Sequence, residues 1–421
     1  MKSNSKHKAF ALTKKGVASL VATALLALIA LFGMTACPNN VEGGAATGTA
    51  NGGNTGGLKW HEAPFIESGA SLILSPDKLT IRVTVTTSDN SPITVEGCDK
   101  TELTSGTRTE LKAKNTGVVL KGKITKLTVG DWQNPNKLTA LNVQGLSALQ
   151  ELHCNSNKLT ELNVQGLNAL QKLRCYGNQL TELNVQGLNV LHTLHCSNNQ
   201  LTALNVQGLN ALHTLRCGVN QLSSLNVQGL SALQYLECYR NQLTELNVQG
   251  LNALKELNCS NNQLTALNVQ GCTALKDLDC WDNQLTALNV QGLNALQRLD
   301  CSSNQLTALN VQGLNALSDL DCSYNSLTSL NVQGCTALAR LNCHINQLNA
   351  EAFKKLFNDL PLRTAYAGAK CLLYTEKTGV TEGNHKDFTS PGELKTAFDN
   401  AKTVKNWKMY KYDTNGHKVE I

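Results

Sequence analysis

Charged or polar side chains recur every 21 residues between residues 153 and 342. One such series is His153, Arg174, His195, Arg216, Glu237, Asn258, Asp279, Asp300, Asp321 and Asn342. The first four members are basic, and most of the later ones are acidic. Like charges that lie close together on a protein surface attract a counter-ion or an oppositely charged partner. If these side chains share one surface, that surface is basic toward its N-terminal half and acidic toward its C-terminal half.

Aromatic side chains make up only 5% of the chain, and those within the repeats fall close to this charged series. Exposed Tyr, Trp and Arg often anchor interfaces because they bury a large area at a small entropy cost. The alternative is that variable surface positions simply hold soluble residues. The predicted ligand-binding residues are Arg174, Tyr176, Arg216, Tyr235, Glu237, Tyr239, Arg240, Asp279, Trp281, Asp300, Asp321 and Tyr324.

Catalytic and metal chemistry find little support in the sequence. Adjacent His and Cys residues, such as His153 and Cys154, would point to opposite faces of a strand and could not share a metal. No Gly-rich phosphate loop, nucleophile elbow or metal-spaced cluster is present. Asp279, Asp300 and Asp321 suggest Ca²⁺ as one hypothesis, with a solvated acidic stripe as the default. We therefore predict no enzyme activity, no cofactor and no committed metal site.

The positions of these side chains follow from a repeat that runs ten times from Leu149 to Leu348. Its pattern is L-x-x-L-x-C-x-x-N-x-L-T-x-L-N-V-Q-G-L-N-A, and we number its positions from the first leucine. One copy cannot enclose its own leucines, so stacked copies must close the core. Strand alternation places Leu152 and Cys154 inward and His153 outward. The third, fifth, seventh and eighth positions should therefore face outward.

Other repeated residues have structural interpretations. Asparagine at the ninth position, from Asn157 to Asn346, should satisfy buried backbone groups. Glycine after Asn-Val-Gln, as at Gly166, should permit a tight reversal with positive φ. Cysteine at the sixth position forms one inward column, and strand spacing of about 4.8 Å disfavours disulfides between its members. Buried free thiols are the expectation.

The repeat resembles the leucine-rich-repeat family, with cysteine where many members have a third leucine, and is similar to repeats of bacterial surface leucine-rich lipoproteins. The resemblance implies a right-handed α/β-type repeat solenoid with a parallel β-sheet on its concave face. We expect a β-rich N-terminal cap over residues 58–123, the array over 124–348, and an α+β C-terminal cap over 349–421.

Within the C-terminal region, Phe353, Leu356 and Phe357 have helical spacing, and Pro361 should end that helix. Ser390-Pro391-Gly392-Glu393 reads as a capping box that opens a second helix reaching about Lys405. Asn415-Gly416 between alternating segments predicts a hairpin. An independent binding module over residues 362–421 is the alternative to a cap.

The N-terminus reads as a targeting segment. Residues 1–36 combine lysines with an apolar run, as in a secretory signal. Met34-Thr35-Ala36-Cys37 resembles the lipobox of bacterial lipoproteins, which implies lipidation of Cys37. Residues 37–57 form a Gly-rich tether. An uncleaved membrane anchor is the alternative.

Charge argues against nucleic acid as a partner. The formal charge of +6 includes five lysines that precede Cys37, and removing them leaves 32 basic against 31 acidic residues. Nucleic-acid binding calls for a concentrated basic surface instead.

The sequence therefore favours a monomeric lipoprotein of the outer membrane or cell surface that binds a protein ligand, as an adhesin does. A glycan-binding protein and a periplasmic structural lipoprotein without an external ligand remain the alternatives.

Overall fold

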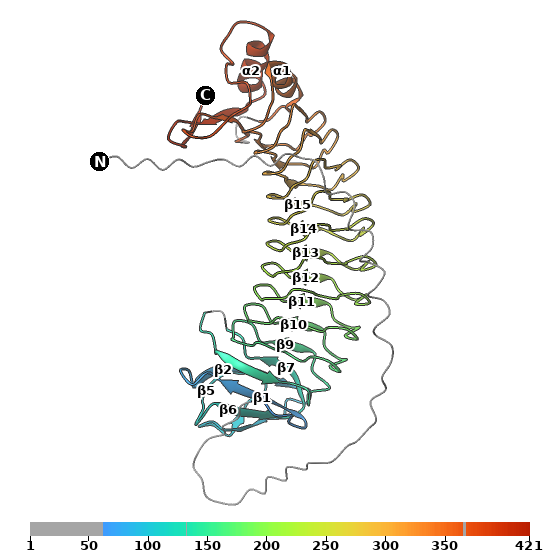
Figure 1. Cartoon of the computed structure of the whole chain (residues 1–421), viewed down its shortest axis with the longest axis vertical. Helices are drawn as coiled ribbons and strands as arrows, with labels where there is room; N and C mark the ends of the chain where they lie inside the picture. The colour runs from blue at the N-terminus through green and yellow to red at the C-terminus, as the bar shows by residue number, and fades with distance from the viewer. Residues whose placement is uncertain (1–61, 132, 365–367) are drawn as a thin grey trace, which may run out of the picture. The chain divides into compact units, whose positions relative to one another are not determined.

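The computed structural model describes residues 62–131, 133–364 and 368–421, and these form a parallel-strand solenoid (Figure 1). The leucine-rich-repeat fold expected from the sequence is thereby confirmed. The predicted signal segment, Cys37 and the tether lie outside the described residues. Among the residues described, no helix has the length and apolar character needed to cross a bilayer.

Each repeat contributes one three-residue strand to a common sheet. These strands are β9 (Glu151–His153), β10 (Lys172–Arg174), β11 (Thr193–His195), β12 (Thr214–Arg216), β13 (Tyr235–Glu237), β14 (Glu256–Asn258), β15 (Asp277–Asp279), β16 (Arg298–Asp300), β18 (Asp319–Asp321) and β20 (Arg340–Asn342). They pair in parallel and without register shifts, so that Arg174 lies beside His195 and His195 beside Arg216. Equivalent repeat positions therefore stack into columns.

The core consists of these columns, with leucine, valine and cysteine side chains almost completely buried. The sixth-position cysteines are free and buried from Cys154 to Cys343, as predicted. Burial raises the pKa of the Cys154 thiol to about 12 and that of Cys175 well above its usual value. These thiols therefore act as small apolar side chains.

The ninth-position asparagines form the expected column of buried hydrogen bonds. Asn241 donates through Nδ2 to the carbonyl oxygens of Cys217 and Cys238, at 3.1 and 3.0 Å. Its Oδ1 accepts from the backbone N–H of Leu222 at 3.0 Å. One amide thus satisfies backbone groups on two successive layers, and no other side chain of similar size offers both functions.

Two positions of each repeat adopt left-handed backbone conformations. The glycines after Asn-Val-Gln, from Gly166 to Gly334, have φ between 77° and 84°, as expected. The eighth position also has positive φ in all ten repeats, between 51° and 67°, which the sequence did not indicate. Only Gly177 is a glycine there, and Val219 and Ile345 are β-branched.

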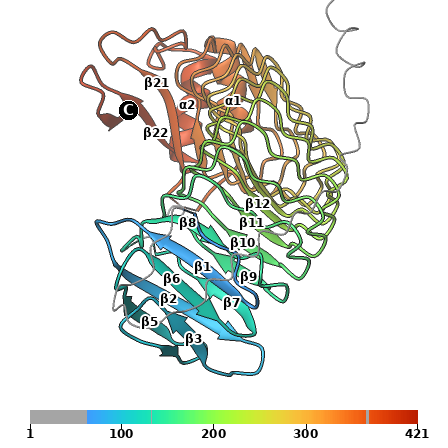
Figure 2. The same ribbon diagram turned by 60° about the horizontal axis from the view of Figure 1, so that its bottom comes forward.

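The N-terminal residues form two groups of strands. β1 (Gly69–Leu74), β3 (Ile93–Glu96), β4 (Glu102–Leu103), β6 (Gly117–Lys121) and β8 (Leu138–Asn142) make a five-stranded sheet. β2 (Thr80–Thr87), β5 (Arg108–Lys112) and β7 (Ile124–Thr128) extend the main sheet, with β7 parallel to β9 (Figure 2). Leu72, Ile81 and Leu120 are fully buried in this region.

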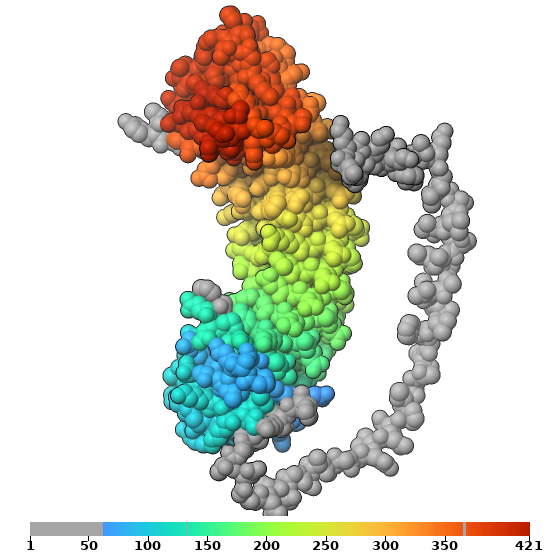
Figure 3. Space-filling model, turned by 60° about the vertical axis from the view of Figure 1, so that its left-hand side comes forward, coloured from blue at the N-terminus to red at the C-terminus, as the bar shows by residue number. Residues whose placement is uncertain are grey.

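The C-terminal region continues the same main sheet. β21 (Lys370–Thr375) pairs in parallel with β20, β22 (Lys408–Tyr412) follows, and β23 (Lys418–Glu420) closes the predicted hairpin. The C-terminal strands are therefore continuous with the sheet of the repeats. The sheet has 16 strands among the residues described, and the colours of Figure 3 succeed one another along the array in chain order. A two-stranded sheet of β17 (Ala308–Asn310) and β19 (Ser329–Asn331) lies on another side of the repeats.

The two C-terminal helices differ in how well the sequence predicted them. α1 (Ala350–Asp359) is capped by Asn349 and buries Phe353, Leu356 and Phe357, as expected. α2 (Glu393–Thr403) begins at Glu393 rather than beside Ser390, so the predicted capping box is wrong. The Ser390 hydroxyl donates to the Asp387 carboxylate instead, which leaves Gly392 at the N-cap without a side-chain hydrogen bond.

Candidate functional site

The candidate site is the strand face, which we define as the outward side chains at the third, fifth, seventh and eighth positions of the ten repeats. The third and fifth positions are partly or fully exposed, as predicted. The seventh position is a partial correction, because Ser197, Ser260 and His344 are buried there.

A cleft of about 360 Å³ opens on β10, β11 and β12. Its lining residues are Arg174, Tyr176, Thr193, His195, Thr214 and Arg216. The Tyr176 and His195 rings stack with centroids 4.2 Å apart and an interplanar angle of 22°. Arg174 and Arg216 occupy the layers on either side of His195. We call this the basic cleft, since no acidic side chain lines it.

The positive charge of the basic cleft is only partly compensated. Arg216 contacts Glu237 on the next strand, with Nε and Oε1 3.2 Å apart. Arg174 is exposed and forms no ion pair with the described residues. Burial, together with Arg216 and Arg174, lowers the pKa of His195 to about 4. His195 is therefore neutral near pH 7, and the cleft's charge comes from its two arginines.

A second, smaller cleft of about 110 Å³ lies on the next strands, β13 to β16. Tyr235, Glu237, Glu256, Asn258, Asp277, Asp279 and Arg298 contribute to its lining, and we call it the acidic cleft. Since Glu237 also pairs with Arg216 of the basic cleft, the two clefts adjoin through this ion pair. The strand face thus changes sign at the boundary between β12 and β13.

The fifth-position carboxylates of the acidic half differ in their partners. Asp300 and Asp321 each accept hydrogen bonds from the serine two residues later, Ser302 and Ser323, at 2.7 and 2.6 Å. Asp279 is followed by Trp281 instead, and its buried Oδ1 has no hydrogen-bond partner.

The pKa of two of these carboxyls reflects this environment. Burial and the neighbouring Asp300 raise the pKa of Asp279 to about 6. Burial also raises the pKa of Asp300. Within the described ranges no group of three or more His, Cys, Asp or Glu side chains is arranged to hold a metal ion, so the Ca²⁺ hypothesis gains no support.

Two aspartates at the third position form ion pairs with arginines at the same position. Arg298 contacts Asp277 at 3.4 Å, and Arg340 contacts Asp319 at 3.0 Å, in each case across neighbouring strands. These two aspartates are therefore neutralised by arginines and add little to the negative charge of the strand face. In the fifth-position column, Glu237 pairs with Arg216 and Asp300 lies 3.9 Å from Arg298, so Asp279 and Asp321 are the acidic members without an ion pair to the described residues.

The aromatic residues do not gather in one cleft. Tyr176 lines the basic cleft and Tyr235 the acidic cleft. The Tyr239 ring lies over Gly218, where an added Cβ would come within 2.6 Å of it. Trp281 is half-buried, and Tyr324 is 48% exposed with its ring 5.0 Å from that of His344. Arg240, beside Tyr239, is exposed.

The predicted set omitted His195, Thr193 and Thr214, although they complete the basic cleft. Their signal was present in the sequence, since each is one 21-residue period from a neighbouring member of the cleft's two columns. Threonine is neither charged nor aromatic, so the pattern of charges and aromatic residues did not indicate it. Its hydroxyl can nevertheless donate to a bound oxygen.

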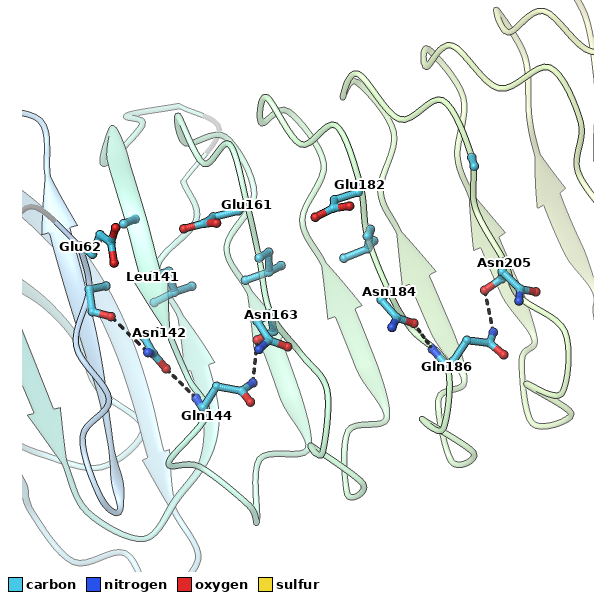
Figure 4. A pocket seen from close by; sticks show the side chains of 15 residues that line it. Glu62, Leu141, Asn142, Gln144, Glu161, Asn163, Glu182, Asn184, Gln186 and Asn205 are labelled. Atoms are coloured by element: carbon cyan, nitrogen blue, oxygen red, sulfur yellow. Dashed lines mark hydrogen bonds between the residues drawn. The ribbon is translucent and has the colours of Figure 1, made fainter. Parts of the chain in front are cut away.

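A larger cleft of about 800 Å³ lies on the side formed by the Leu-Asn-Val-Gln segments (Figure 4). Glu62, Glu161 and Glu182 extend into it, and asparagine and glutamine side chains line its other edge. Those amides are engaged in the fold: Gln144 Nε2 donates to the Asn163 carbonyl at 2.9 Å, and Gln186 repeats the contact with Asn205. This surface therefore repeats the same structural contacts from layer to layer.

No protein-family model matches the chain, and no curated protein sequence matches it significantly. Solved leucine-rich-repeat structures do. YopM from Yersinia enterocolitica is 26% identical with a TM-score of 0.51, covering 63% of this chain and 52% of its own. The functional domain of InlJ from Listeria monocytogenes, described as including a cysteine ladder, is 26% identical with a TM-score of 0.46 over 66% of this chain and 72% of that one. A leucine-rich-repeat protein from Leptospira interrogans is 26% identical with a TM-score of 0.41, covering 64% of this chain and 80% of that one. The chain thus spans about half the length of YopM.

Proposed function

We propose that this chain is a membrane-anchored bacterial surface protein that binds a host or microbial protein through its strand face, as an adhesin does. The observation that carries the proposal is the pair of adjoining clefts of opposite charge, joined by Arg216 and Glu237. A protein ligand can present both signs of charge, whereas a uniform polyanion would be repelled by the acidic cleft. Extended repeat surfaces of this kind suit such binding.

The anchor in this proposal is a lipid on Cys37, which holds the array outside the cytoplasm as a monomer. Substituting Cys37→Ser should abolish incorporation of radiolabelled palmitate and release the protein from the membrane fraction. Retention of the variant in membranes without palmitate would favour the uncleaved apolar segment as the anchor. Protease treatment of intact cells should degrade the array if it faces the medium, and protection would place it in the periplasm.

Binding is tested by replacing Tyr235, Tyr239 and Trp281 together with alanine. These side chains are half-buried on the strand face, so their loss should weaken attachment of cells to host tissue or partner bacteria by at least tenfold. The matched control replaces Glu161, Glu182 and Glu245 with alanine on the Leu-Asn-Val-Gln side. Unchanged attachment in the aromatic variant, or equal loss in the control, would show that the strand face is not the binding surface.

Glycan binding is a second candidate because the stacked Tyr176 and His195 rings offer a platform for a sugar. A glycan array probed with the full chain distinguishes glycan binding from protein binding. Strong binding to a defined oligosaccharide that is lost in Tyr176→Ala would favour the glycan.

A further inference from the structure

We infer that the basic cleft is a recognition site for a tetrahedral oxyanion ester on an aromatic ring, namely a sulfated or phosphorylated tyrosine of the protein ligand. The inference rests on the proposed function in one respect, that the ligand is a protein. It goes further by naming the chemical group bound and the residues that bind it.

The donors of the cleft converge from several directions. Arg174, His195 and Arg216 occupy the same position on three successive strands, so the two arginine Cα atoms are about 9.6 Å apart at a strand spacing of about 4.8 Å. Each guanidinium can therefore reach a group held above His195. Thr193 and Thr214 add hydroxyl donors from the neighbouring third-position column.

This arrangement suits a tetrahedral oxyanion better than a planar carboxylate. A carboxylate is satisfied by one bidentate arginine, whereas sulfate and phosphate esters have three terminal oxygens that can accept from separate donors. Arg174 is free of ion pairs with the described residues, and Arg216 retains donors beyond its Nε contact with Glu237. Two charged donors thus remain for the ligand.

The stacked rings of Tyr176 and His195 are the reason for expecting an aromatic ring in the ligand. Tyr176 and His195 are stacked at 4.2 Å beside the arginines, which provides a flat surface against which a ligand ring can pack. The cleft volume of about 360 Å³ suits a single large side chain. A polyanionic chain is disfavoured, because the acidic cleft begins on the next strand, β13.

The titration of His195 provides an independent test of anion binding in the basic cleft. The charged or titratable groups around it are Arg174 and Arg216 on the flanking strands, with Tyr176 against its ring, His153 two layers before and Glu237 two layers after. Burial and, to a smaller extent, the two arginines lower the pKa of His195 to about 4. A bound anion offsets the repulsion from the arginines, so the pKa of His195 rises on binding, and the affinity for the sulfate ester, whose charge is constant, increases as the pH falls from 7 toward 4. A phosphate ester has a second pKa of about 6 and loses charge over the same range, so this pH trend is expected for sulfotyrosine only.

The test uses the full chain and three acetylated, amidated Gly-Tyr-Gly peptides carrying sulfotyrosine, phosphotyrosine or unmodified tyrosine. Calorimetric titration should show binding of one or both esters and at least a tenfold weaker interaction with unmodified tyrosine. The stronger of the two ester arms identifies the modification. The His195 ring resonances should titrate at higher pH in the complex.

Arg174→Gln and Arg216→Gln should each weaken ester binding at least tenfold without lowering the melting temperature, since both side chains are at least partly exposed. Arg340→Gln is the matched control, because Arg340 lies on the same face but outside the basic cleft. Equal affinity for the three peptides, an unchanged affinity in both arginine variants, or binding of heparin oligosaccharides but not of the peptides would overturn the inference.

The two proposals can fail separately. Ester binding at the cleft together with cell attachment that is insensitive to the strand face would remove only the adhesin proposal. Attachment that needs Tyr235, Tyr239 and Trp281 without any ester binding would remove only this inference.

Discussion

Asp279→Asn should stabilise the protein near neutral pH, although it removes a charge from the candidate binding surface. The Asp279 carboxyl has a buried Oδ1 without a hydrogen-bond partner and lies in register with Asp300. Its pKa is raised from 3.8 to about 6 by burial and by Asp300. The folded state therefore holds this proton more tightly than the unfolded state does.

The sign and size of the effect follow from that difference. Below about pH 4 the group is protonated in both states and contributes nothing; as the pH rises through 6, the unfolded state ionises first and stability is lost. The upper bound for this loss is about 3 kcal/mol, from about 1.4 kcal/mol for each pKa unit. Solvent screening of the partly exposed side chain reduces the expectation to about 1–2 kcal/mol.

Urea denaturation at pH 4 and pH 7 measures the free energy of unfolding of Asp279→Asn and wild type. The variant should gain about 1–2 kcal/mol at pH 7 and much less at pH 4. Asp77→Asn is a control of opposite sign, because the Lys137 ammonium, 2.6 Å away, lowers the pKa of Asp77 to about 2. The same gain at both pH values, or a loss at pH 7, would refute the argument about Asp279.

Three further outcomes are expected. Asn241→Ala should cost about 1–3 kcal/mol in urea denaturation, because it leaves the buried Leu222 N–H without an acceptor and removes one of the two donors to the Cys217 and Cys238 carbonyls, while exposed Asn210→Ala should cost less than about 0.5 kcal/mol. Val219→Gly should stabilise by about 0.5–1 kcal/mol, since φ of 56° strains a β-branched residue, and Gly177→Val should destabilise. The sixth-position thiols, such as Cys175, should resist iodoacetamide at pH 8 until denaturant is added, and rapid native labelling would contradict their burial.

The sequence was informative wherever a residue type directly reports its environment. Leucine, cysteine and asparagine recur at fixed positions because the core columns accept only apolar side chains or a donor–acceptor amide, so period and alternation located them correctly. The left-handed eighth position was not predictable in this way. Its conformation is imposed by the backbone bend that follows each strand, and side chains as different as Gly177 and Ile345 tolerate it.

Pairwise contacts across layers explain the remaining differences between expectation and structure. Asp277, Arg298, Asp319 and Arg340 alternate in charge at one period, so their neutralisation was implicit in the sequence once strict register was assumed. The basic cleft could not be predicted from the repeat period alone. The stacking of Tyr176 on His195 depends on how the side chain at the seventh position of one layer is oriented toward that at the fifth position of the next.

Although the basic and acidic clefts adjoin, their unpaired charges, Arg174 and Asp279, are far enough apart to act on different parts of a ligand. Arg174 and Asp279 are five layers apart, which corresponds to about 24 Å at about 4.8 Å for each layer. The Debye length at physiological ionic strength is about 8 Å, so each of these charges scarcely influences a group bound at the other. Arg216 and Glu237 form an ion pair at the boundary between the two clefts. A ligand that engages both charges must therefore carry an anionic and a cationic group separated by a similar distance, and a short peptide with mixed charges cannot satisfy both.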